Sequence, residues 1–156
     1  MEGDNMSTAQ RIQLPDGSTV NLPGGGYELV ASVKTEEEVS RIALSGFEAN
    51  ELLIITQLKK TGDNATQMVP VLTLNGKWGA SDPFINITSS LPTSYFQHLT
   101  MYAFAKDGNV FVKSESYDVI KNVFDNQNFK NLTSVEIERT GTPNYAIGCK
   151  VLVYAR

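Results

Sequence analysis

The sequence has one histidine, His98, and one cysteine, Cys149, that could act as a general base or a thiol nucleophile. His98 lies in an alternating apolar and polar run over residues 96–102, and no Gly-x-Ser-x-Gly motif offers it a serine to activate. This pattern predicts a strand histidine at a sheet surface. Cys149 alternates with Tyr145, Ile147, Val151 and Val153, which predicts a small core residue rather than an activated thiolate. One Cys and one His also cannot supply the ligands of a structural zinc site.

Acidic and amide side chains offer two further kinds of chemistry. Glycoside hydrolysis needs two carboxyl groups about 5–9.5 Å apart in a cleft, but the run at 36–38 and the pair Glu136 and Glu138 are typical of a solvated face. Oxygen ligands at 63–64 and 125–128 could bind calcium, yet neither stretch has EF-hand spacing, and such residues usually form turns. We therefore predict no catalytic residue, no cofactor, no metal and no enzymatic activity.

Trp78 is the one aromatic residue that the sequence places in an apparent loop. A tryptophan ring can stack on the apolar face of a sugar, and Asp82 and Asn86 could supply hydrogen bonds to its hydroxyl groups. The same ring could instead cap the hydrophobic core, because aromatic side chains bury a large apolar area. The sequence leaves both interpretations open, with Trp78, Asp82 and Asn86 as the possible ligand-binding residues.

Composition limits the kinds of partner. The chain has 156 residues, a formal net charge of −4, and 37 residues that are Ser, Thr or Asn. This length favours one domain with its own core. The acidic balance argues against nucleic-acid binding, because phosphates are recognised mainly by Lys and Arg. No apolar run approaches the ~18 residues needed to cross a bilayer, and we expect no contact with a membrane.

The first 26 residues differ in pattern from the rest. Residues 1–10 offer no periodic apolar set. Residues 11–22 alternate around a Pro-Asp-Gly turn, which predicts a small hairpin, and the glycines at 24–26 predict a hinge. A hairpin of this size is marginal by itself, so we expect residues 1–26 to dock on the main domain or on another subunit. The candidate attachment residues are Arg11, Ile12, Leu14, Val20 and Leu22.

From Tyr27 onward the apolar residues recur with a period of two, which predicts a domain of short antiparallel strands over 27–156. Residues 52–58 are apolar on both faces near their start, which indicates a central strand. Turn signals separate the segments. The other predicted strands are 27–33, with residues 27, 29, 31 and 33 on one face, and 68–74, 84–88, 96–105, 110–116, 133–139 and 145–154.

Two stretches fit either a helix or a strand. Thr35 to Glu38 has the spacing of a helix capping box, but residues 39–44 also alternate as a strand, which we favour. Residues 118–124 pair apolar positions at helical offsets within a strand-rich region, and both alternatives stay open there. The number and spacing of the strands predict an all-β fold, a two-sheet antiparallel β-sandwich of jelly-roll type with a short N-terminal arm.

Two segments carry a resemblance to a known family. The stretch Val33 to Phe47 followed by Glu51 to Thr56, and the final strand Ile147 to Arg156, look like the jelly-roll modules of tailed-bacteriophage virion proteins, whose last strand often closes on a Tyr-Gly-Arg-like tail. Here Ala155 stands where Gly is usual. The resemblance covers residues 27–156.

This resemblance implies a structural protein of the virion, assembled in the host cytoplasm. The expected roles are a capsid decoration protein, a head fibre, or a tail or baseplate accessory. The implied partners are the major capsid or tail protein of the same particle and further copies of the chain, with a trimer as the expected oligomer. A lectin-like module that reads host-surface glycans is the alternative.

Overall fold

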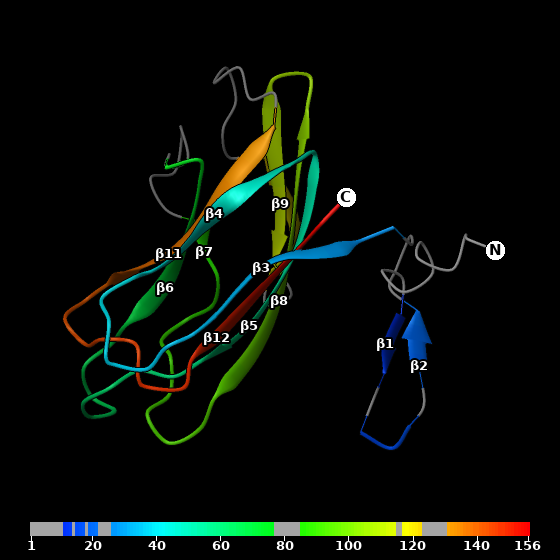
Figure 1. Ribbon diagram of the computed structural model, residues 1–156. Helices are drawn as coiled ribbons and strands as arrows, with labels where there is room; N and C mark the ends of the chain where they lie inside the picture. The colour runs from blue at the N-terminus through cyan, green and yellow to red at the C-terminus, as the bar shows by residue number, and fades with distance from the viewer. Residues whose placement is uncertain are drawn as a thin grey trace.

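The computed structural model describes residues 11–13, 15–17, 19–21, 26–76, 85–114, 117–122 and 131–156. Within these ranges every regular element is a β-strand, and none is a helix that could cross a membrane. Figure 1 shows two packed sheets and a separate hairpin. The strands are β1 (Arg11–Gln13), β2 (Thr19–Asn21), β3 (Glu28–Lys34), β4 (Ile42–Ala49), β5 (Glu51–Leu58), β6 (Val69–Leu74), β7 (Ile85–Asn86), β8 (Gln97–Lys106), β9 (Asn109–Ser114), β10 (Tyr117–Asn122), β11 (Leu132–Thr140) and β12 (Lys150–Ala155).

The order of the strands is that of a jelly roll. One sheet has six strands in the order β10-β9-β8-β5-β12-β3, and the other has four in the order β4-β11-β6-β7. All neighbouring strands are antiparallel. The chain crosses repeatedly between the sheets, and β9 and β10 extend one edge beyond the eight strands of the basic fold. The predicted all-β jelly-roll sandwich is therefore confirmed.

The core lies between the sheets and follows the predicted alternation. Leu52, Ile54 and Leu58 of β5 are fully buried in it, facing residues such as Leu72 and Leu74 of β6. Burying apolar side chains is the main favourable term in folding. Leu53, one residue out of phase, is also buried, but in a second cluster on the other face of the sheet. The prediction that β5 is central and apolar on both faces is confirmed.

The N-terminal hairpin forms a sheet of its own. β1 and β2 pair antiparallel, with Ile12 opposite Val20, and neither strand joins the two large sheets. Leu14 and Leu22 of the predicted attachment set lie outside the described residues. The division of the chain at residue 26 stays a prediction.

Two ambiguous stretches are strands or turns. The helix alternative at 36–44 is wrong: residues 36–37 form a bend, Val39 makes a single bridge to Tyr145, and β4 begins only at Ile42. The segment therefore becomes a strand three residues later than predicted. Residues 117–122 form β10, so a helix is wrong there too, while 123–124 lie outside the described residues. Pairing with β11 and β9 overrides local helical spacing in both places.

A β-bulge changes one predicted face. Val153 pairs with Ala31, but the next residue, Tyr154, pairs with Leu29, so Val30 is the extra residue in β3. Ala31 packs on the core between the sheets, whereas Tyr27 lies in the cluster on the opposite face. The prediction that residues 27, 29, 31 and 33 share one face is therefore wrong, because one inserted residue reverses the alternation.

Candidate functional site

The residues considered for catalysis lie on different parts of the fold and do not form a catalytic set. His98 is exposed on β8, opposite Gln57 of β5. Cys149 is fully buried in the core. Glu136 and Glu138 lie 3.6 and 3.7 Å from Nη1 of Arg41, so their carboxylates form ion pairs on the four-stranded sheet. Among the described residues no group of three or more His, Cys, Asp and Glu could hold a metal ion.

Cys149 is part of the structure that joins the loops at one end of the sandwich. Its thiol contacts the backbone of Lys59, 3.4 Å from both the amide nitrogen and the carbonyl oxygen. The Thr35 hydroxyl donates to the Ala146 carbonyl at 2.8 Å and accepts from the Cys149 amide at 2.9 Å. Burial raises the pKa of the Cys149 thiol above its ordinary value of 9.0. The prediction of a core cysteine is confirmed, although its neighbour Ile147 is exposed rather than buried.

Alkaline solution should therefore weaken the fold. Burial raises the pKa of Cys149 above 9.0 and the pKa of Tyr145 well above 10.0, so the unfolded chain loses these protons first. The free energy of unfolding should be unaffected by these two groups below about pH 8 and should fall as the pH rises through 9 to 11. Urea titrations across this range test it, with Cys149→Ala as the variant that should show a smaller decline. An equal decline in both proteins would contradict the role of the thiol.

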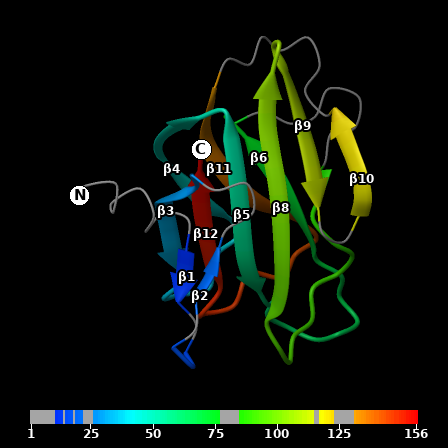
Figure 2. The ribbon, with the colours of Figure 1, turned by 90° about the vertical axis from the view of Figure 1, so that its right-hand side faces the viewer.

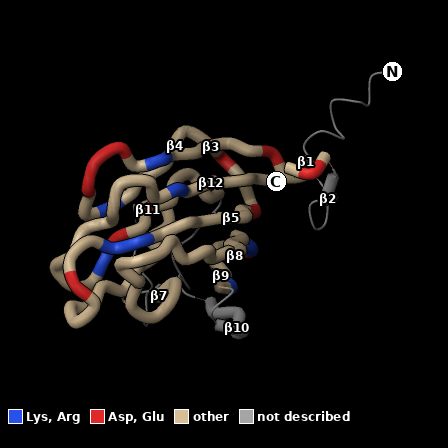
Figure 3. Tube along the Cα trace, turned by 90° about the horizontal axis from the view of Figure 1, so that it is seen from below, with Lys and Arg blue, Asp and Glu red and all other residues tan. Residues whose placement is uncertain are grey.

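Only one of the three predicted sugar-binding residues lies among the described residues. Trp78 and Asp82 lie outside the described residues. Asn86 is exposed on β7, an edge strand of the four-stranded sheet. The acidic run at 36–38 forms the turn between β3 and β4, visible as a red stretch in Figure 3.

The possible calcium ligands at 63–64 are already used inside the protein. The carboxylate of Asp63 accepts a hydrogen bond from the Thr66 amide at 2.8 Å, and the side-chain oxygen of Asn64 accepts one from the Thr93 hydroxyl at 2.6 Å. The Lys60 ammonium donates to the carbonyls of Asp63 and Thr66. A positive charge of the chain itself thus occupies this loop. The other candidate, 125–128, lies outside the described residues.

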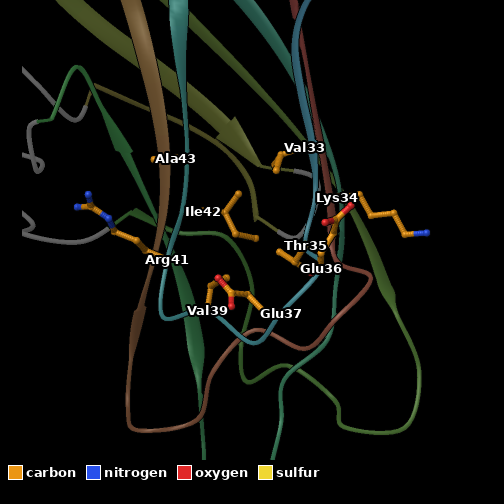
Figure 4. A pocket seen from close by; sticks show the side chains of 9 residues that line it. All are labelled: Val33, Lys34, Thr35, Glu36, Glu37, Val39, Arg41, Ile42 and Ala43. Carbon is orange, nitrogen blue, oxygen red and sulfur yellow. The ribbon is translucent and has the colours of Figure 1, made fainter.

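One hollow lies at the open edge of the sandwich, between edge strands β3 and β4 (Figure 4). It has a volume of about 590 Å³. Val33 and Ile42 lie on its two sides, while the side chains of Lys34 and Arg41 point away. This edge groove is lined in about equal measure by aliphatic side chains and by polar side chains such as those of the acidic turn.

A second hollow lies on the outer face of the six-stranded sheet, the face that Figure 2 presents to the viewer. It has a volume of about 340 Å³ and its wall includes Tyr27, Glu51, Tyr102, Phe104 and Lys113. We call it the aromatic hollow. Strand pairing determines how its side chains are arranged. Glu51 of β5 lies opposite Phe104 of β8, and Tyr102 of β8 lies opposite Lys113 of β9. Adjacent strands about 4.8 Å apart bring these side chains onto one surface.

Ionic contacts order one side of the aromatic hollow. Oε2 of Glu51 lies 2.5 Å from the Arg156 guanidinium and accepts a hydrogen bond from the Tyr27 hydroxyl at 3.2 Å. The guanidinium also covers the Tyr27 ring, 4.8 Å from its centroid. Burial, followed by the Glu51 carboxylate, raises the pKa of Tyr27 above 10.0. Tyr27 therefore stays protonated and keeps donating to Glu51 at neutral pH.

Part of this site was visible in the sequence. The alternation of residues 96–104 predicts one face for Phe96, Tyr102 and Phe104. The structure confirms this for Tyr102 and Phe104, whereas Phe96, just before β8, packs on the core. Glu51 and Tyr27 carried no local signal, because only the pairing of β5 with β8 and the bulge at Val30 bring them to that face.

Comparison with known proteins shows no family to which the chain belongs. No family model matches the chain, and no curated protein matches it. A solved structure of a sialidase is similar with a TM-score of 0.38 and 11% sequence identity, over 86% of this chain and 15% of that chain. The class of the protein is therefore described from its fold, which is an all-β sandwich with jelly-roll strand order.

Proposed function

We propose that this protein is a non-enzymatic structural protein of a virion, a capsid decoration, head-fibre or tail accessory protein attached through its N-terminal arm. The observation that carries the proposal is the independence of the hairpin: β1 and β2 pair only with each other. A two-stranded hairpin is marginally stable by itself. A surface of another protein that packs on it would supply the missing burial, and this makes the hairpin an attachment element.

The jelly roll supports the same role. Its strands form two packed sheets that bury a continuous core, and this gives a stiff body. Structural proteins need such a body joined to an element that attaches. The partners are then the capsid or tail protein of the particle and further copies of the chain. Closed symmetry favours a defined homo-oligomer, and we propose a trimer.

Charging the hairpin should abolish attachment and leave the sandwich folded. Ile12 and Val20 lie directly opposite each other, and two carboxylates at such a pair destabilise the hairpin by repulsion. The full-length chain should elute as one defined oligomer and be found on purified virions, whereas Ile12→Asp with Val20→Asp should be monomeric and absent from them. Light scattering after size exclusion and immuno-electron microscopy of virions measure the two results.

The control is Ser32→Asp, which adds a carboxylate at an exposed position of β3. It should leave both the oligomer and the attachment unchanged, and all three proteins should melt at the same temperature. A monomeric wild type, or a hairpin variant that still decorates virions, would refute the proposal.

A further inference from the structure

We infer that the aromatic hollow is a saccharide-binding site. This inference does not depend on the virion role, because it rests only on the side chains of the six-stranded sheet. It also differs from the sugar site expected from the sequence, since it uses neither Trp78 nor Asn86. Four features of the hollow support it: its size, its ring platform, its oriented carboxylate and the mixture of donors and acceptors.

The size of the hollow fits a small ligand rather than a protein surface. Its volume of about 340 Å³ lies at the lower end of the range of about 300–1,000 Å³ that is usual for small-molecule pockets. Its wall spans three neighbouring strands, from Glu51 on β5 through Phe104 on β8 to Lys113 on β9. At about 4.8 Å per strand this is close to 10 Å across, which suits one or two sugar rings.

The ring platform consists of the Tyr102 and Phe104 side chains, which line the hollow. Phe104 and Phe111 stack with ring centroids 5.1 Å apart and planes inclined by 16°. Phe104 and Tyr102 line the hollow and are both partly exposed. A pyranose ring presents C–H groups on one face, and these pack on the electron-rich face of an aromatic ring. Aliphatic side chains, such as those of the edge groove, lack this complementary surface.

The oriented carboxylate supplies a hydrogen-bond acceptor. Within the described residues both contacts to the Glu51 carboxylate, from Arg156 and Tyr27, use Oε2. Oε1 is therefore left to accept from a ligand hydroxyl, and the side chain is 38% exposed. Because the two contacts fix the rotamer before a ligand arrives, binding loses less side-chain entropy.

Donors and acceptors occur together, as vicinal sugar hydroxyls require. Each hydroxyl both donates and accepts, so a site that offers only one kind of group leaves half of them unsatisfied. Here the Glu51 carboxylate accepts, the Lys113 ammonium donates, and the Tyr102 hydroxyl can do either. The surface of the hollow is mostly apolar, so the set suits a ring that has apolar faces and a few hydroxyl groups.

Calorimetric titration of the full-length protein tests the inference. The probes are maltotriose, cellotriose, chitotriose and lactose, and at least one should bind with a Kd of about 1 mM or tighter. Tyr102→Leu and Phe104→Leu keep apolar burial but remove the flat ring, and each should weaken that binding about tenfold. Tyr95→Ala removes an aromatic ring that is 61% exposed and outside the hollow, so it should leave the Kd unchanged.

Thermal melting of each variant separates loss of binding from loss of folding, and saturation-transfer NMR should show contact between aromatic protons and the sugar. Three results would each overturn the inference. The first is that no probe binds the wild type, and the second is that both leucine variants bind with the same Kd as the wild type. The third is that light scattering shows the leucine substitutions to dissociate a dimer, which would make a second copy the occupant. If Trp78→Ala lost binding while the two leucine variants kept it, the sugar would bind outside the aromatic hollow, and this result would also refute the inference.

Discussion

Replacing Tyr145 by alanine should lower the free energy of unfolding by about 4 kcal/mol, because it removes a fully buried aromatic side chain and leaves a cavity. Tyr145 is among the largest fully buried residues of the protein and lies in the core between the sheets. Its hydroxyl donates to the Glu138 carbonyl at 2.5 Å. Its backbone bonds to Val39 in both directions, at 2.8 and 3.2 Å, and bridges to Lys60.

Tyr145 thus joins three loops at one end of the sandwich, the β3–β4, β5–β6 and β11–β12 connections. Tyr145→Phe keeps the ring and removes only the hydroxyl, so we expect a smaller loss of about 1–2 kcal/mol. Urea unfolding followed by circular dichroism measures both variants. Tyr95→Ala, at an exposed loop position, is the matched control and should stay within about 0.5 kcal/mol of the wild type. Equal losses for Tyr145→Ala and Tyr145→Phe would show that the hydroxyl, not the ring, dominates.

Replacing Lys60 by methionine should destabilise the protein by about 3 kcal/mol, although burying a lysine has a desolvation cost. The side chain is 2% exposed. Its ammonium donates to the Asp63 carbonyl at 3.0 Å and to the Thr66 carbonyl. Methionine has a similar length and fills the same space, but it leaves both carbonyls without a donor. Hydrogen bonds to a charged donor contribute about 1.5–3 kcal/mol to stability.

Lys59→Met is the control for Lys60→Met, since it removes the same charge from the neighbouring residue. Lys59 is only partly buried, and its ammonium lies 4.8 Å from the centroid of the Phe96 ring. Loss of this cation–π contact should cost about 1 kcal/mol or less. The urea midpoints of the two variants compare their stabilities. If Lys60→Met is as stable as Lys59→Met, the loop does not need its internal cation.

The strand content and much of the core could be read from the sequence because they depend on local alternation. Leu52, Ile54 and Leu58 are buried as their period of two predicts, and Cys149 is a core residue for the same reason. The Pro-Asp-Gly turn also identified the hairpin of β1 and β2. These features follow from the backbone preferences of a few consecutive residues.

Features that depend on distant pairing could not be read in this way. The bulge at Val30 becomes visible only when β12 lies beside β3, and it moves Tyr27 from the predicted face to the outer one. The acidic turn before β4 had the spacing of a helix cap, yet Thr35 bonds instead to residues 146 and 149, more than a hundred positions away.

The candidate site also combines features set by local alternation with features set by distant strand pairing. Alternation alone put Tyr102 and Phe104 on one face of β8, and the aromatic platform is to that extent a property of the sequence. Glu51, Arg156 and Lys113 come to it from β5, from the residue after β12 and from β9. Their meeting depends on strand register, which is set by the packing of the whole sandwich. The sequence by itself therefore determined which residues are strand and core, and only the tertiary structure decided which side chains share a site.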